Sequence, residues 1–200
     1  FRASGASAFS YELPHDHNFD FLTLGYFGPG YSSDYYEYDY EAVAGAISEK
    51  AGLRFIERST LDPGKIMHYR AGFDVHSQLP PESLSVSLNI MHSGGAQGWF
   101  DQYSFDIEKD TIEAVLSPGA SEVFLRAAVG LGCPNARDLA QDFAKNHVSE
   151  RMRLTALEAQ AGVLGMAERD ELWRRAESSA SKLIAAEAKR HREAIELEVV

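Results

Sequence analysis

The sequence is poor in cysteine: Cys133 is the only one among 200 residues, so no intrachain disulfide can form. A single thiol suits a reducing compartment, and we expect a cytoplasmic protein. Cys133 stands beside Pro134 in a connection between expected helices, which favours a buried thiol over a nucleophile. Long apolar runs are also missing. No segment approaches the roughly 18 apolar residues of a membrane span, so the sequence predicts no transmembrane helix.

Positive charge is scarce as well. Lysine and arginine together number 19 against 30 aspartates and glutamates, which gives a formal net charge of −11. No basic patch or stripe stands out, so we expect neither nucleic acid nor an anionic membrane as a partner. The chain has no signal or transit peptide pattern and begins at Phe1 rather than at methionine. We therefore expect a fragment whose preceding segment is missing.

Composition changes near Ser117-Pro118-Gly119. Before this point the chain is rich in tyrosine, phenylalanine and glycine in short alternating runs, and after it alanine, glutamate, arginine and leucine dominate. The sequence therefore predicts an α+β chain with a β domain over residues 1–118 and a helical extension over residues 119–200. Many short strands separated by glycine and proline turns are typical of a sandwich or a small barrel.

Alternation and turn residues define the expected strands, which cover residues 9–21, 36–41, 53–59, 65–70, 74–78, 84–90, 99–107 and 111–116. The glycines and the proline from Gly25 to Gly30 predict a loop. Three helices are expected. They begin near Ser121, Asn135 and Ala167; the second continues or breaks near Ser149, and the last runs almost to the end of the chain.

His15 and His17 are the most informative residues of the chain. Within residues 9–21 the odd positions are aromatic, aliphatic or histidine, whereas the even positions are polar, acidic or proline. A strand sends alternate side chains to opposite faces, so both imidazoles share the core-facing side. Two inward imidazoles at positions i and i+2 can chelate one metal ion. A histidine that only forms an ordinary hydrogen bond in the core needs no second histidine beside it.

A third histidine follows two turns. Pro63-Gly64 and then Gly72 precede His76, and together with His15-Asp-His17 they form a pattern that resembles the two motifs of the cupin superfamily. The resemblance covers roughly residues 9–118. It implies a small antiparallel β-barrel of the cupin, or jelly-roll, type. It also implies that the three histidines converge inside the barrel on one divalent metal ion.

One position departs from the cupin pattern. Where the first motif usually carries a glutamate, this chain has Phe21 or Leu22, and Asp20 lies on the opposite strand face unless a bulge reorients it. The resemblance therefore implies a site of three neutral imidazoles, similar to the iron sites of cupin thiol dioxygenases. Fe(II) is the expected metal, with Zn, Ni, Cu and Mn as alternatives, because imidazole suits several ions. A closed structural site would take a fourth protein ligand.

Other side chains are candidates for roles around the metal. Arg70 precedes the third histidine and is an anion-binding candidate, with a surface salt bridge as the alternative interpretation. Gln78 shares a strand face with the third histidine and is a candidate hydrogen-bond donor to the pocket. Tyr103 shares a face with Trp99, and it lines the same cavity or packs in the core. His92 precedes a glycine-rich loop, where it is either solvated or at a pocket mouth.

These features predict a mononuclear metal-dependent oxygenase that uses dioxygen and acts on a small polar metabolite or a peptide side chain. An ion held by three neutral ligands keeps its full charge, which favours an anionic substrate. Two alternatives stay open: a non-catalytic cupin module that binds a small ligand, and a metal-dependent isomerase or lyase. The amphipathic helices are expected to pack on the barrel and to contribute the contact of a homodimer.

Overall fold

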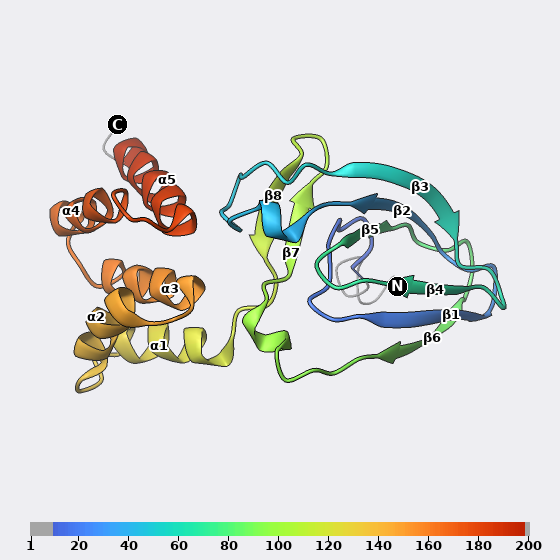
Figure 1. The fold of residues 1–200 in the computed structure, drawn as a ribbon, viewed down its shortest axis with the longest axis horizontal. Helices are drawn as coiled ribbons and strands as arrows, with labels where there is room; N and C mark the ends of the chain where they lie inside the picture. Colours follow the sequence, from blue (N-terminus) through green and yellow to red (C-terminus); the bar gives the residue numbers. More distant parts are fainter. Residues whose placement is uncertain (1–9, 199–200) are drawn as a thin grey trace. The chain divides into compact units, whose positions relative to one another are not determined.

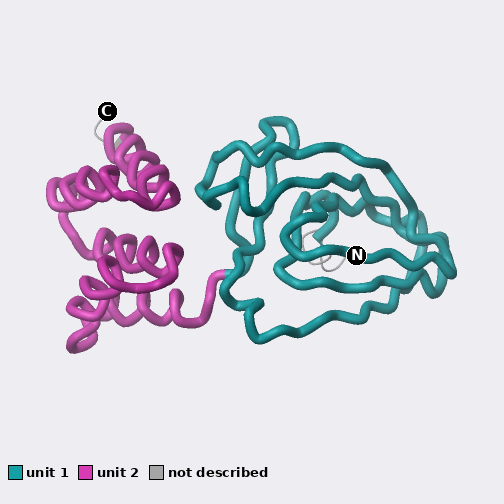
Figure 2. The backbone as a smooth tube through the Cα atoms, viewed as in Figure 1, with its two compact units in different colours: residues 1–117 teal, residues 118–200 magenta. Residues whose placement is uncertain are grey.

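The computed structural model describes residues 10–198 and divides the chain into two compact units, residues 1–117 and 118–200 (Figure 2). All strands of the described residues lie in the first unit, and the helices longer than one turn lie in the second. The prediction of an α+β chain with small antiparallel sheets followed by helices is therefore confirmed. None of the described helices is both long enough and apolar enough to cross a membrane.

Two three-stranded antiparallel sheets form the layers of the β unit (Figure 1). The first has the order β4-β1-β6, with β4 at Ile66–Tyr69, β1 at Phe21–Phe27 and β6 at Val86–Met91. The second has the order β3-β2-β5, with β3 at Arg54–Thr60, β2 at Ser32–Glu37 and β5 at Asp74–Gln78. A hairpin follows, of β7 at Tyr103–Asp106 and β8 at Thr111–Val115. The described strands pair within these open sheets, and a closed barrel stays a prediction.

The opening segment differs from the continuous strand predicted over residues 9–21, of which Phe9 lies outside the described residues. Glu12 has a positive φ of 58°, and Pro14 has no N–H to donate, so a regular ladder does not form there. Instead, His15 makes isolated bridges to β5 on one side and to β7 on the other. The segment thus lies between the β3-β2-β5 sheet and the β7-β8 hairpin and joins them.

Three further predictions of local structure were wrong. β1 continues through Gly25 to Phe27, where a loop is predicted, because glycine lets the strand pass against the β3–β4 turn: a Cβ on Gly25 would lie 2.2 Å from the carbonyl oxygen of Asp62. A 3-10 turn, η2 (Tyr40–Ala42), takes the place of the end of the strand predicted over residues 36–41. Another, η3 (Gln97–Trp99), takes the place of the start of the strand predicted over residues 99–107.

Five helices make up the described part of the second unit, and they are α1 (Ala120–Gly130), α2 (Ala136–Asn146), α3 (Glu150–Ala161), α4 (Met166–Ala176) and α5 (Lys182–Glu198). The predicted second helix breaks at Ser149, whose hydroxyl caps α3 by accepting the N–H of Met152 at 3.2 Å. The single last helix that the sequence predicts is split before α5, where the Ser181 hydroxyl accepts the N–H of Ile184 at 3.3 Å. Cys133 is exposed, contrary to the prediction of a buried thiol.

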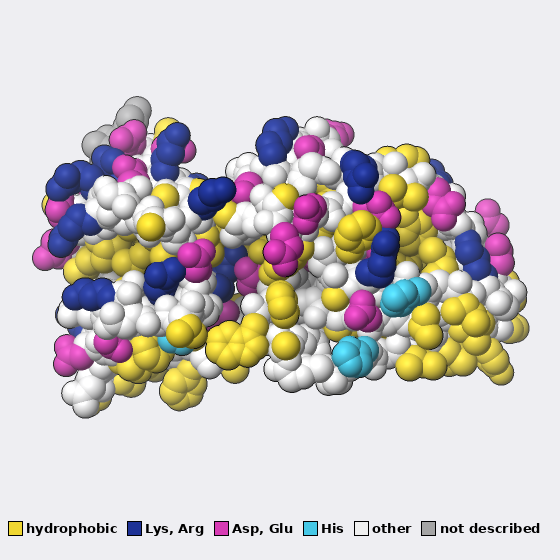
Figure 3. Space-filling model, in the orientation of Figure 1, with side chains coloured by type: hydrophobic (Ala, Val, Ile, Leu, Met, Phe, Trp, Pro, Cys, Tyr) yellow, Lys and Arg dark blue, Asp and Glu magenta, His cyan; other side chains and the backbone are white. Residues whose placement is uncertain are grey.

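The β4-β1-β6 sheet presents apolar side chains outward. Leu22, Ile66, Leu88 and Ile90 are all exposed, and the strand register places Leu22 opposite Ile90. In the space-filling view, hydrophobic side chains gather among charged ones on the visible face of the β unit (Figure 3). His76 and Tyr69, in contrast, are buried on the inward face of the sheets.

Candidate metal centre

The backbone of the β unit brings two distant segments together at the histidines. His15 donates its N–H to the carbonyl of His76 at 3.0 Å, and His76 donates back to the carbonyl of His15 at 2.9 Å. Two more backbone bonds, of 3.0 and 3.2 Å, tie the same segment to β7. Because His17 follows His15 by two residues, its side chain returns to the same side, so all three imidazoles share one space.

The turns of the predicted second motif hold the third histidine's strand in place. Gly72 donates its N–H to the carbonyl of His17 at 2.8 Å. Its φ is +62°, and a Cβ there would approach Tyr40 within 3.3 Å, so this turn favours glycine for both backbone and space. Pro63-Gly64 forms the tight turn between β3 and β4, with Gly64 at a φ of +85°. The turns therefore set the register of β4 and β5, and β5 carries His76.

The three side chains form a compact cluster. One potential ligand atom from each of His15, His17 and His76 can be chosen so that all three lie within 4.8 Å of one another. The ring centroid of His15 lies 4.8 Å from that of His17 and 4.5 Å from that of His76. The Nε2 atoms of His17 and His76 approach to 3.1 Å. This spacing and this donor set fit a single metal ion bound by imidazole nitrogens.

Hydrogen bonding assigns the tautomer of one ring. Nδ1 of His15 lies 2.8 Å from the carbonyl oxygen of Leu13, so Nδ1 carries the proton and Nε2 keeps a free lone pair. Such a bond from the second nitrogen is what orients most metal-binding histidines. The Nδ1 atoms of His17 and His76 are buried and have no hydrogen-bond partner. Those two rings are therefore held by packing and by their mutual contact.

Burial keeps the cluster neutral. It lowers the pKa of His17 to about 3, with the nearby His15 as the second cause, and it lowers the pKa of His76 well below the ordinary value. The pKa of His15 is also lowered by burial, against the opposing effect of its bond to Leu13. Neutral imidazole is the form that binds a metal ion, so at pH 7 no proton has to leave before binding.

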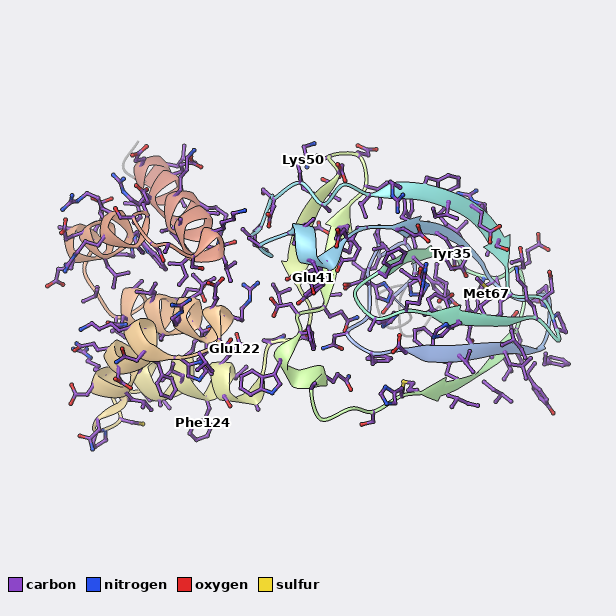
Figure 4. All side chains as sticks on the ribbon, viewed as in Figure 1. Tyr35, Glu41, Lys50, Met67, Glu122 and Phe124 are labelled. Atoms are coloured by element: carbon purple, nitrogen blue, oxygen red, sulfur yellow. The ribbon has the colours of Figure 1, made fainter. Side chains whose placement is uncertain are left out.

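Aromatic rings from both sheets enclose the histidines. Phe21 of β1 and Tyr69 of β4 stack in parallel, with centroids 4.4 Å apart, and Phe21 lies 4.8 Å from His17. Tyr69 lies 4.9 Å from His76, and its hydroxyl shares a 2.8 Å hydrogen bond with Tyr35. Figure 4 labels Tyr35 on β2. The ring of Phe21 thus lies against His17, and Phe21 stands where the cupin pattern has a carboxylate.

The carboxylate between the two histidines points the other way. Asp16 is fully buried and accepts the hydroxyl of Tyr38 at 2.5 Å and the N–H of Tyr103 at 2.6 Å. Burial raises its pKa to about 6, although both hydrogen bonds act in the opposite direction. Asp20 is also engaged, because it accepts the N–H of Ala71 at 2.9 Å. Both carboxylates are therefore committed to the backbone and to Tyr38, which leaves the three imidazoles as the ligand set.

The other predicted site residues lie elsewhere. Arg70 is half exposed, pairs with Asp74 at 2.6 Å and Glu37 at 2.8 Å, and stacks on Phe73; this is the surface salt bridge of the alternative interpretation. Its guanidinium is therefore paired with two carboxylates and is not free to bind an anion.

Tyr103 and Gln78 have different positions. Tyr103 belongs to a buried cluster with Val75, and Val75 points to the sheet face opposite its neighbour His76. Tyr103 is therefore a core residue on the far side of the sheet, which is the second of the two interpretations that the sequence allows, whereas Trp99 is exposed. Gln78 lies two residues beyond His76 on β5 and is half buried, and its carbonyl accepts the N–H of Glu12 at 2.8 Å.

Sequence reasoning missed Tyr35 and Tyr69, the two hydroxyl-bearing rings beside His76. The available signal was weak. Tyr35 is the direct cross-strand partner of His76 in the β2–β5 pairing, but that register depends on which strands pair. A reading by alternation alone groups Tyr36 with Tyr38 and Tyr40 and leaves Tyr35 on the other face.

No protein-family model, no curated protein and no solved structure matches this chain. The case for a metal centre therefore depends on the geometry of the three histidines and on the chemistry of imidazole.

Proposed function

We propose that this chain is a cupin-type metal-dependent oxygenase in which His15, His17 and His76 hold one first-row ion, Fe(II) in the first instance. The observation that carries the proposal is the convergence of three buried, neutral imidazoles, with one potential ligand atom from each within 4.8 Å. A satisfied core histidine needs one hydrogen-bond partner, whereas these rings leave two Nδ1 atoms unpaired and bring two Nε2 atoms together.

When bound, the ion would supply Lewis acidity and open coordination positions for dioxygen and an anionic substrate. The protein's own residues do the rest. The bond from His15 to Leu13 aims Nε2 into the cluster, and the stacked rings of Phe21 and Tyr69 exclude bulk water from one side. Within residues 10–198, the cluster holds no carboxylate that would reduce the charge of the ion, which supports an anionic small polar metabolite or peptide side chain as substrate.

Metal content is the direct test. The protein is purified after expression in iron-rich medium, and its metals are measured by elemental analysis together with those of two variants. His76→Ala should lose the ion. His68→Ala should keep it, because His68 is an exposed histidine of β4 outside the cluster. About one first-row ion in wild type supports the proposal, and an unloaded protein that also fails to take up Fe(II) in vitro contradicts it.

Oxygen uptake then tests the reaction class. A panel of small thiols, amino acids and keto acids should include a compound that stimulates oxygen consumption by wild type and not by His76→Ala. Turnover without oxygen would instead support the isomerase or lyase alternative. The non-catalytic module is favoured by one observation: the 3.1 Å contact between the Nε2 atoms of His17 and His76 can be a hydrogen bond without any metal. A ligand-induced melting shift that chelators leave unchanged would support that alternative.

A further inference from the structure

A separate cavity of about 410 Å³ lies in the β unit, outside the histidine cluster. Residues 18–20, η2, the turn at residues 71–73 and the loop from His92 to Asp101 form its walls. Its volume falls within the range of small-molecule sites, roughly 300 to 1,000 Å³. Four aromatic residues line it, and they are Phe19, Tyr40, Phe73 and Phe100. Four carboxylates line it too, and they are Asp20, Asp39, Glu41 and Asp101.

The walls are fixed by hydrogen bonds, so the cavity does not depend on a loop held only by packing. The side-chain amide of Asn18 donates to the carbonyl of Phe100 at 3.0 Å and to that of Gln97 at 3.3 Å. The N–H of Asp101 donates to the hydroxyl of Tyr40 at 2.9 Å. These bonds anchor the second half of the outer loop to the opening segment and to η2, and at the other end of the loop the N–H of His92 donates to the carbonyl of Asp20 at 2.9 Å.

The charge of the lining has one sign. No lysine or arginine is among the described residues that line the cavity, and the exposed His92 is the only basic side chain there. Arg70 stacks on Phe73, but its guanidinium is paired with Asp74 and Glu37. Glu41 lies on η2, where it is exposed (Figure 4), and Asp39 uses one oxygen to accept the N–H of Glu41 at 3.1 Å. The cavity therefore attracts cations and repels anions.

The geometry distinguishes between kinds of cation. Among the described residues, the histidines are the one group of three or more side chains close enough to hold a metal ion, so no three of the four carboxylates of the cavity can ligate one ion together. Aromatic faces attract organic cations through the ring quadrupole, most strongly where the cation is partly desolvated. We infer that this cavity binds the ammonium or guanidinium group of a small organic cation, between aromatic faces and carboxylates.

The inference does not depend on a bound metal. Residues 18–20 follow His17 directly, and Gly72 lines the cavity while its N–H bonds the carbonyl of His17 at 2.8 Å. The cavity and the histidine cluster thus adjoin the same backbone segments, but the side chains that would bind the ligand and the metal are different. Cation binding should persist in His76→Ala, which separates a failure of this inference from a failure of the proposed oxygenase function.

Calorimetric titration with two matched probes tests the inference. Butylguanidinium and butylurea have nearly the same shape, but only the first is charged. The full chain should bind butylguanidinium with saturation at or below about 10 mM and at least about tenfold more tightly than butylurea. Raising the salt concentration should weaken binding, because exposed carboxylates are screened. Equal affinity for the two probes, or no binding of butylguanidinium, would overturn the inference.

Variants locate the binding to the cavity. Glu41→Gln and the double variant Asp39→Asn/Glu41→Gln remove charge from two exposed side chains. One is on η2 and the other is its N-cap, where asparagine can also accept the N–H of residue 41, so the fold should survive. The double variant should weaken butylguanidinium binding about fivefold or more, and Phe100→Leu should weaken it as well. Glu82→Gln removes an exposed carboxylate elsewhere in the β unit and should have no effect. Binding that is unchanged in the double variant, with a melting temperature like that of wild type, contradicts this site.

Discussion

The Nε2 atoms of His17 and His76 lie 3.1 Å apart inside the β unit, although 59 residues separate them in sequence. Two neutral rings can share one proton between these atoms, with one nitrogen as donor and the other as acceptor. Both Nδ1 atoms nevertheless stay buried without a partner, which costs stability. A metal ion would replace this single hydrogen bond with coordination by both Nε2 lone pairs, and an ion that binds only the folded state stabilises that state.

Metal should therefore stabilise the fold. An ion that binds only the folded state raises the free energy of unfolding by about 2.7 kcal/mol when its free concentration is 100 times its Kd. We expect Fe(II) or Zn(II) to raise the melting temperature of chelator-treated protein, as measured by circular dichroism. His17→Ala should abolish the increase, and His68→Ala should preserve it. A rise of the same size in His17→Ala would show that the ion binds elsewhere.

Tyr38 should stabilise the segment that carries the histidines. Its hydroxyl donates to the fully buried Asp16 at 2.5 Å, and hydrogen bonds to charged groups contribute about 1.5–3 kcal/mol. Tyr38→Phe should lower the free energy of unfolding by that amount in urea titrations at pH 8, where Asp16 is ionised. Tyr36→Phe changes the same kind of side chain on β2, where Tyr36 is less buried, and should cost less. Equal losses in the two variants would argue against a specific role for Asp16.

The sequence predicts that the side chains of His15 and His17 share one face. It does not predict which strands hold this segment in place. Alternation places both side chains on one face, and this holds even though Glu12 and Pro14 prevent a regular strand. What alternation cannot show is that β5 and β7 flank the segment, because strand pairing depends on contacts distant in sequence. For the same reason, the sequence could not show that Arg70 pairs with Asp74 and Glu37, or that Tyr103 packs in the core.

Gly25 illustrates another limit of the sequence. Glycine and proline near Gly25 predict a loop, yet β1 continues because the absence of a side chain lets the carbonyl of Asp62 approach. Gly25→Ala should therefore cost at least about 1–3 kcal/mol of stability in urea titrations, as expected for overpacking against backbone. Gly95→Ala places its Cβ in open space and serves as the control. A Gly25→Ala protein as stable as the control would mean that β1 and the β3–β4 turn separate easily.

The stability of the metal-free protein should fall as the pH is lowered from about 6.5. Burial lowers the pKa of His15, His17 and His76 in the folded protein, and the pKa of His17 falls to about 3. In the unfolded chain their pKa is about 6.5, so below that pH the unfolded state binds protons that the folded state does not. Each such histidine lowers the free energy of unfolding by roughly 1.4 kcal/mol per pH unit until its own folded pKa is reached.

Asp16 acts in the opposite direction and provides the control for this pH dependence. Its pKa is raised to about 6 in the folded protein, so its contribution is present at low pH and is lost as the pH rises through 6. One carboxyl opposes three imidazoles, and the net effect between pH 6.5 and 4.5 should still be loss of stability on acidification. Urea titrations of chelator-treated protein at pH 7, 6 and 5 measure it. Asp16→Asn should make the decline steeper and His76→Gln shallower, whereas a flat profile in wild type would show that the imidazoles are charged or solvated in the folded state.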